Sequence, residues 1–184
     1  MRVGKDNTVE IGFPKGVEFA LADGLLSVKG PKGGISRKFA DPAISVKAAE
    51  GKIVLGTKRL TKKEKTKMGT MAAHMRNMIR GVTEGIVYKL KVCSGHFPMS
   101  VQVKGKEFIV NNYIGEKYPR TLKLKYPDIK VEVTGDLVTV TGAYKEHVAQ
   151  TAADIETLLR RSEYDKRIFQ DGVYIFDKDG KLEK

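Results

Sequence analysis

Several residue types and patterns that define particular protein classes are scarce or missing in this sequence. Among its 184 residues there is one cysteine, Cys93, and no tryptophan. A single cysteine cannot form a disulfide framework and is typical of a reducing compartment, so we expect a cytoplasmic protein. No apolar run approaches the roughly 20 residues that a membrane span needs, and the first ten residues contain no apolar segment. We therefore expect neither a membrane helix nor a secretory signal.

Patterns that carry catalysis or bind metals are also missing. The chain has no GxxxxGK[ST] phosphate loop, no HExxH zinc motif, no CxxC pair and no GxSxG nucleophile turn. Its three histidines, His74, His96 and His147, lie far apart, so we interpret each as a surface or hydrogen-bonded residue. Cys93 ends an alternating segment that starts at Tyr88, where we expect a small buried side chain. We expect no catalytic residue, no metal, no cofactor and no small-molecule substrate.

Positive charge, in contrast, is abundant. The 34 Lys and Arg residues outnumber the 22 Asp and Glu residues, which gives a net charge of +12 and an isoelectric point near 9.7. This excess predicts a polyanionic partner, either nucleic acid or an anionic membrane surface, with a solvated basic surface as the alternative. Residues 1–85 carry 17 basic and 8 acidic residues, whereas residues 86–184 carry 17 and 14. The second half must therefore rely on local clusters of cations.

One order of predicted elements occurs twice. Each half contains an alternating strand, a glycine-containing turn, a second strand, a hairpin and a helix with an apolar stripe. In the first half these lie at 24–30, 30–34, 35–39 and 44–55, and the helix follows a basic stretch at 58–67. In the second half they lie at 107–110, 111–117, 120–125, 129–140 and 148–159.

The two helical segments also align with each other. TMAAHMRNMIR (70–80) matches QTAADIETLLR (150–160), with Met75 and Ile155 as equivalent core positions. We predict an α+β fold that is a tandem duplication of a small antiparallel sheet packed by one helix. The first repeat is expected at 1–82 and the second, with a C-terminal tail, at 83–184. Within the tail, residues 172–176 are predicted to pack as a strand or extended arm.

Cations that lie near glycine turns or aromatic side chains are the candidate RNA contacts. In the first half these are Lys32 in the Gly30–Gly33 turn and Lys65 and Lys67 in the basic stretch, although a turn and a solvated loop explain them equally well. Cations neutralise phosphates and rings stack on splayed bases, so we favour the cluster in the second half. Its members are Gly115, Lys117, Arg120, Arg160, Arg161, Tyr164, Lys166 and Arg167.

Several strings, in this order along the chain, are similar to those of a known family. They are VKGPKG (28–33) with Ser36-Arg37, RNMIRGVTEG (76–85), HFP (96–98), NYIGEK (112–117), and Arg167 with FQDGVY (169–174). Together they resemble the universal large-subunit ribosomal protein L6 family, and the last three resemble its archaeal and eukaryotic branch. We favour the archaeal type. The chain departs from the bacterial branch, which has a Pro- and Gly-rich, Lys-containing motif where this chain has residues 164–174.

The resemblance implies a non-catalytic constituent of the large ribosomal subunit. A family member would bind 23S rRNA beside the sarcin–ricin loop, at the base of the factor-binding stalk and close to the subunit interface. Its other partners would be neighbouring large-subunit proteins, and its second domain would supply much of the RNA contact. The alternative is a free RNA-binding regulator or scaffold, which would not sediment with the large subunit.

Overall fold

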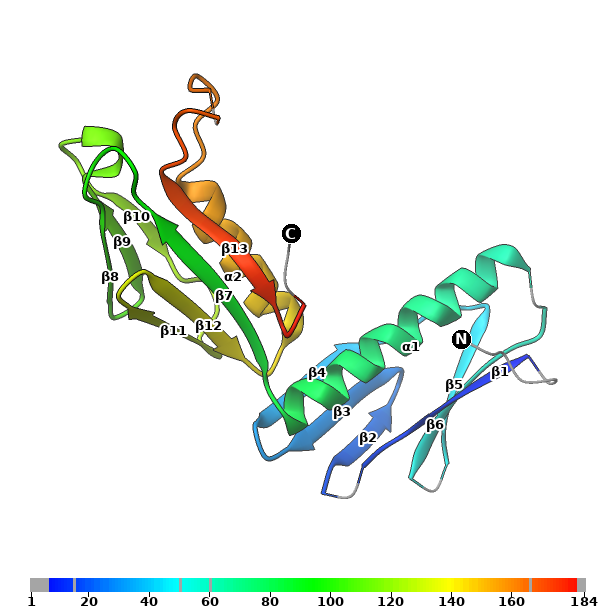
Figure 1. The fold of residues 1–184 in the computed structure, drawn as a ribbon. Helices are drawn as coiled ribbons and strands as arrows, with labels where there is room; N and C mark the ends of the chain where they lie inside the picture. Colours follow the sequence, from blue (N-terminus) through cyan, green and yellow to red (C-terminus); the bar gives the residue numbers. More distant parts are fainter. Residues whose placement is uncertain (1–6, 15, 50, 60, 166, 182–184) are drawn as a thin grey trace. The chain divides into compact units, whose positions relative to one another are not determined.

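The computed structural model describes residues 7–14, 16–49, 51–59, 61–165 and 167–181 (Figure 1). The chain divides into two compact units, residues 1–85 and residues 86–184. None of the helices in the described ranges is long and apolar enough to cross a membrane.

Unit 1 consists of two small antiparallel sheets and one helix. The sheets have the strand orders β1-β6-β5 and β2-β3-β4, and helix α1 packs against strands of both. The elements are β1 (Thr8–Gly12), β2 (Glu18–Ala22), β3 (Leu25–Gly30), β4 (Gly33–Lys38), β5 (Ile44–Ala49), β6 (Lys52–Thr57) and α1 (Lys62–Thr83).

Unit 2 repeats this arrangement and adds one strand. Its sheets have the orders β10-β9-β8 and β11-β12-β7-β13, and helix α2 packs against β7, β12, β13 and β10. The elements are β7 (Ile86–Cys93), β8 (Ser100–Lys104), β9 (Glu107–Asn111), the short 3₁₀ turn η1 (Tyr113–Gly115), β10 (Arg120–Lys123), β11 (Ile129–Thr134), β12 (Leu137–Gly142), α2 (Lys145–Leu158) and β13 (Gly172–Lys178).

The two units have the same topology. Strands β1 to β6 correspond in order to β7 to β12, because β1-β6-β5 matches β7-β12-β11 and β2-β3-β4 matches β8-β9-β10. The predicted α+β duplication is confirmed, with the strands of each repeat divided between two sheets. The strand predicted at 172–176 is also confirmed, since β13 pairs antiparallel with β7 and lies beside it in Figure 1.

Each helix contributes its apolar stripe to the core of its own unit. In α1 the buried side chains include Met68, Ala72, Met75 and Val82, and in α2 they include Val148, Ala152 and Ile155. These spacings of three, four and seven residues keep the side chains on one face of a helix. Met75 and Ile155, aligned from sequence, are both fully buried.

Two local expectations differ from the structure. The basic stretch at 58–67 is not wholly a loop, because α1 begins at Lys62 and includes Lys65 and Lys67. Lysine is a good helix former, and the buried Met68 and Ala72 follow at helical spacing, so the helix extends back through the charged residues. Cys93 is half-buried rather than buried, because it lies at the end of β7 on the face opposite Val92.

Candidate RNA-binding surface

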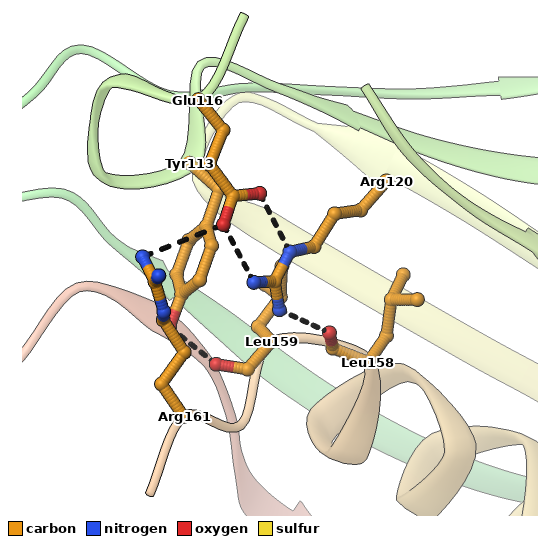
Figure 2. Close-up of polar contacts among 6 residues, drawn as sticks. All are labelled: Tyr113, Glu116, Arg120, Leu158, Leu159 and Arg161. Atoms are coloured by element: carbon orange, nitrogen blue, oxygen red, sulfur yellow. Dashed lines mark hydrogen bonds and ion pairs between the residues drawn. The ribbon is translucent and has the colours of Figure 1, made fainter. Parts of the chain in front are cut away.

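A polar network surrounds the carboxyl end of α2. The last carbonyls of a helix have no partner within the helix and need donors from elsewhere. Here the Tyr113 hydroxyl donates to the Leu159 carbonyl, and Arg120 Nη1 donates to the Leu158 carbonyl at 2.8 Å (Figure 2). Burial raises the pKa of the Tyr113 hydroxyl, which keeps it protonated and able to donate. Residues near the third and fourth strands of the unit therefore cap its helix.

Glu116 lies between two arginines of this network. Its carboxylate accepts from Arg120 Nε at 2.8 Å and Nη2 at 2.7 Å, and it lies 3.4 Å from Arg161 Nη1 (Figure 2). The hydrogen bond with Arg120 lowers the pKa of Glu116 and raises that of Arg120, so both stay charged. The Arg120 guanidinium also lies 4.5 Å from the centre of the Tyr113 ring. Arg120 is thus fully engaged within the unit.

The turn between β9 and β10 positions these groups. Asn112, Ile114 and Gly115 all have positive φ, at 56°, 48° and 75°. A Cβ on Gly115 would lie 3.4 Å from the Phe97 ring, in a backbone conformation that favours glycine. The resulting tight path buries Tyr113 and leaves the next residues outside, with Lys117 exposed and Tyr118 85% exposed.

The segment after α2 is held by aromatic contacts. The Arg161 guanidinium lies 4.6 Å from the centre of the Tyr164 ring, and Tyr164 meets Phe169 edge-on at 4.9 Å. Phe169 in turn lies 5.0 Å from the His96 ring. Tyr164, predicted to stack on RNA bases, is therefore half-buried and partnered within the unit.

Asp171 joins this segment to the loop after β7. Its buried carboxylate accepts the backbone N–H groups of Gly95 and His96, and its Oδ2 lies 3.0 Å from His96 Nδ1. Burial alone would raise the pKa of Asp171, but these hydrogen bonds outweigh it and lower the pKa. The tail is therefore a fixed part of the unit where it meets β13.

We use the name "tip of unit 2" for residues 94–99, 112–120, 159–165 and 167–171. The tip brings together most of the residues predicted in the second half. Three of its cations are exposed: Lys117, Arg160 and Arg167. Arg167 has only a contact of 3.3 Å with Asp165, and its side chain is 91% exposed. Lys166, predicted with them, lies outside the described residues.

In unit 1 the predicted glycine turn has a structural role. The Lys32 N–H donates to the Val82 carbonyl at 2.9 Å, which docks the turn on the end of α1. A Cβ on Gly30 would lie 2.7 Å from the same oxygen, so this position requires glycine for close approach. The Lys32 side chain remains exposed.

The two predicted lysines of α1 differ from each other. Lys67 Nζ lies 2.7 Å from Asp41, so an internal carboxylate already faces this cation. Lys65 is exposed, and its side chain has no ion pair within the part of the chain that the structure describes. Lys65, together with Lys62 and Lys63, forms a free basic group on the first turns of the helix.

Sequence reasoning did not identify Tyr113, His96 or Asp171 as parts of the site, and it included Glu116 only as part of the 115–117 turn, without its ion pairs. Glu116 and Arg120 have the spacing of a helical ion pair, but they lie in a turn and a strand, so helical rules do not apply. His96 and Asp171 are 75 residues apart, and no local pattern links them. The other histidines also have polar neighbours, since His74 lies 3.1 Å from Arg37 and His147 2.9 Å from Asp128. In the described ranges, no group of three His, Cys, Asp or Glu side chains could hold a metal ion.

Comparisons with known proteins match both units. A family model described as ribosomal protein L6 matches residues 13–85 and 97–172, one segment in each unit. The large ribosomal subunit protein uL6 of Methanobrevibacter smithii is 44% identical over 170 residues, 92% of this chain and 95% of that protein. The proteins of the same name from Methanosarcina mazei and Haloquadratum walsbyi are 42% and 41% identical. These alignments cover 93% and 91% of this chain, and 96% and 94% of the relatives. The chain therefore belongs to the ribosomal protein L6 family.

Proposed function

We propose that the chain is a non-catalytic constituent of the large ribosomal subunit in the cytoplasm, where it binds 23S rRNA. Membership of the L6 family supports this function, because relatives that match almost the whole chain are named large ribosomal subunit proteins. The net charge of +12 fits a polyanionic partner. The family is structural, so the protein acts by fixing the positions of RNA segments and not by catalysis.

The proposed binding site is rRNA near the sarcin–ricin loop, at the base of the factor-binding stalk and close to the subunit interface. Neighbouring large-subunit proteins at the stalk base are the proposed protein partners. Support for this location comes from the family resemblance of the strings at 96–98, 112–117 and 169–174, which lie in or next to the tip of unit 2.

The observation that carries the proposed RNA face is the division of the tip into cations engaged inside the unit and cations exposed to solvent. Arg120 and Arg161 are engaged with Glu116, whereas Lys117, Arg160 and Arg167 extend into solvent. Free cations neutralise phosphates and release condensed counterions, which supplies most of the affinity for RNA. The exposed Tyr118 ring adds a surface on which an unpaired base can stack.

The internal cations have a different role in this proposal. Arg120 and Tyr113 hold the 112–119 turn against the end of α2, so Lys117 is presented from a rigid backbone. A preorganised contact loses less conformational entropy on binding than a flexible one. Gly115 contributes through its positive φ and does not need to contact the RNA itself.

The experiment that tests this proposal compares two matched sets of charge variants. One protein carries Lys117, Arg160 and Arg167 changed to Gln, and the other carries Lys62, Lys63 and Lys65 changed to Gln. Binding to a fragment of 23S rRNA that contains the sarcin–ricin loop is measured over a range of salt concentrations. About five phosphate contacts give a log–log slope of roughly −3 to −5, and each lost contact makes the slope shallower by about 1 unit or slightly less.

We expect the unit 2 set to weaken binding more than the unit 1 set. Both variants lose the same charge, so a general effect of net charge would weaken them equally. A larger loss in the unit 1 set, with both proteins folded, would place the RNA on unit 1. A wild-type slope near zero would remove the electrostatic account. Sedimentation of the wild-type chain apart from the large subunit would favour the free regulator.

A further inference from the structure

The outer edge of β1 in unit 1 is the counterpart of an edge that is covered in unit 2. In unit 2, β7 lies between β12 and β13 (Figure 1). In unit 1, β1 pairs with β6 on one side, and no strand in the described ranges pairs with its other side. The duplicated fold therefore contains one position that β13 fills in unit 2 and that has no occupant in the described part of unit 1.

The backbone register shows that the two edges are equivalent. The Phe13 N–H donates to the Gly51 carbonyl, as the Val92 N–H donates to the Asp136 carbonyl. Along a strand of an antiparallel sheet, the backbone N–H and C=O groups of successive residues point alternately toward one neighbouring strand and away from it. In β7 the residues facing away from β12 are Val87, Lys89 and Lys91, and they pair with β13 or the residues just after it.

The corresponding residues of β1 are Thr8, Glu10 and Gly12. The register Ile11–Ile53 matches Leu90–Val138, which makes Glu10 the counterpart of Lys89. By the same alternation, the N–H and C=O groups of these three residues point away from β6. An unpaired row of donors and acceptors at a sheet edge is a template for another strand.

We propose that the outer edge of β1 receives an extended segment of a neighbouring large-subunit polypeptide, which adds to the sheet as β13 does in unit 2. This inference rests on the proposed function, because it takes the partner from the large subunit.

The charges at the edge define the partner further. In unit 2, Lys89 of β7 faces Asp177 of β13, with Nζ and Oδ2 3.4 Å apart. In unit 1 the charge at the equivalent position is reversed, because it is Glu10. Glu10 contacts Lys52 at 3.3 Å, but both side chains are more than half exposed. The expected segment therefore carries Lys or Arg opposite Glu10.

The helix supplies a second observation. In unit 2, Leu159 at the end of α2 is buried and lines the same pocket as Val173 of β13. Its counterpart in the helix alignment is Ile79 of α1, which is only half-buried. An added strand beside β1 with an apolar residue on the α1 side would cover Ile79 as β13 covers Leu159. The expected segment is thus extended, with alternating apolar residues and a Lys or Arg opposite Glu10.

Hydrogen exchange tests this inference on the full chain. In the isolated protein, the amides of Thr8, Glu10 and Gly12 should exchange quickly, whereas those of Val9 and Ile11 are protected by β6. In purified large subunits, the three outward amides should become protected by about tenfold or more. The same chain bound only to the 23S rRNA fragment should keep fast exchange at these three positions.

A second arm uses Glu10→Pro, with Glu10→Thr as its matched control. The N–H that proline removes at position 10 points away from β6. Edge strands tolerate proline at positions of this kind. We expect the proline variant to be lost from large subunits at a lower salt concentration than the threonine variant. If Glu10→Pro does not fold, the exchange of the wild-type amides decides the question.

The outcomes separate this inference from the proposed function. If the wild-type chain sediments with the large subunit but its three outward amides still exchange quickly, only the inference fails. Protection by rRNA alone would assign the edge to RNA, and protection that rises with concentration of the isolated chain would assign it to a second copy. Either result would overturn the proposal that a neighbouring polypeptide binds this edge. If the chain does not sediment with the subunit, the inference and the proposed function fail together.

Discussion

The two units close the carboxyl end of their helix with the same connection, between the third and fourth strands, but by different means. In unit 1 the connection is two residues long, and the Lys32 backbone N–H donates to the Val82 carbonyl beside Gly30. In unit 2 it is eight residues long, and the side chains of Tyr113 and Arg120 donate to the last carbonyls. The last carbonyls of a helix need hydrogen-bond donors, and in this fold either backbone or side-chain groups supply them.

One position in the fourth strand shows what this difference changes. Ile35 of β4 faces Val28, and Arg120 of β10 faces Val110, so the two residues are equivalent in register. The isoleucine is buried in the core, whereas the arginine extends to the helix end and fixes Glu116. Through this exchange the longer turn of unit 2 is held against the end of α2, and Lys117 within the turn is exposed. Under the proposed function the RNA face lies on unit 2, although unit 1 has the larger excess of cations, so net charge alone would place it on the other unit.

The largest expected effect comes from the two equivalent core positions of the helices. Met75→Ala and Ile155→Ala should each lower the free energy of unfolding by about 2–5 kcal/mol, because each leaves a cavity in a fully buried site. Urea unfolding followed by circular dichroism measures this. The exposed pair Ala73→Gln and Ala153→Gln is the control and should change stability by less than about 0.5 kcal/mol. A large loss at only one of the two core positions would break the equivalence of the units.

A smaller effect should separate the internal cation of the tip from the free one. Arg120→Gln leaves Glu116 without its main partner and should lower the free energy of unfolding by about 1–3 kcal/mol. Lys117→Gln should leave stability unchanged and should weaken binding to the rRNA fragment. Thermal unfolding and RNA titration of the same two proteins decide the matter. Equal stability of the two variants would mean that Arg120 does not support the tip.

The smallest effect concerns acid. The lowered pKa of Asp171 means that its carboxylate stabilises the folded state above the unfolded pKa, about 3.9, and that this stability is lost as the pH falls through the folded value. Asp171→Asn should be less stable at pH 7 by about 1 kcal/mol and should lose less stability below pH 4. Asp41 in unit 1 is the carboxylate for comparison, because its pKa is also lowered, by hydrogen bonds from Lys67 and the Ala43 N–H. Unfolding curves from pH 2 to pH 7 test this, and an unchanged acid profile in Asp171→Asn would contradict it.

Much of the fold could be predicted from the sequence because its signals are local. The apolar stripes of 68–79 and 148–159, the alternating strands and the glycine turns recur in the same order in both halves. The strands β1, β2 and β8 were not predicted from the sequence, since each has five residues, which is too short for an alternating pattern to stand out. The start of α1 was placed too late because a run of lysines resembles a solvated loop.

The sequence by itself determined the duplication, the basic character and the residues that make the family recognisable. Only the tertiary structure decided which cations are free, because that depends on partners far along the chain. Arg120 is engaged by Leu158, 38 residues away, while Lys117, three residues before it, is exposed. Only the tertiary structure also shows that the outer edge of β1 has no partner strand in the described ranges. Strand pairing joins residues far apart in the chain, and a local sequence pattern does not indicate which strands pair. Local side-chain patterns specify the elements, and packing between distant elements specifies which of their groups remain available.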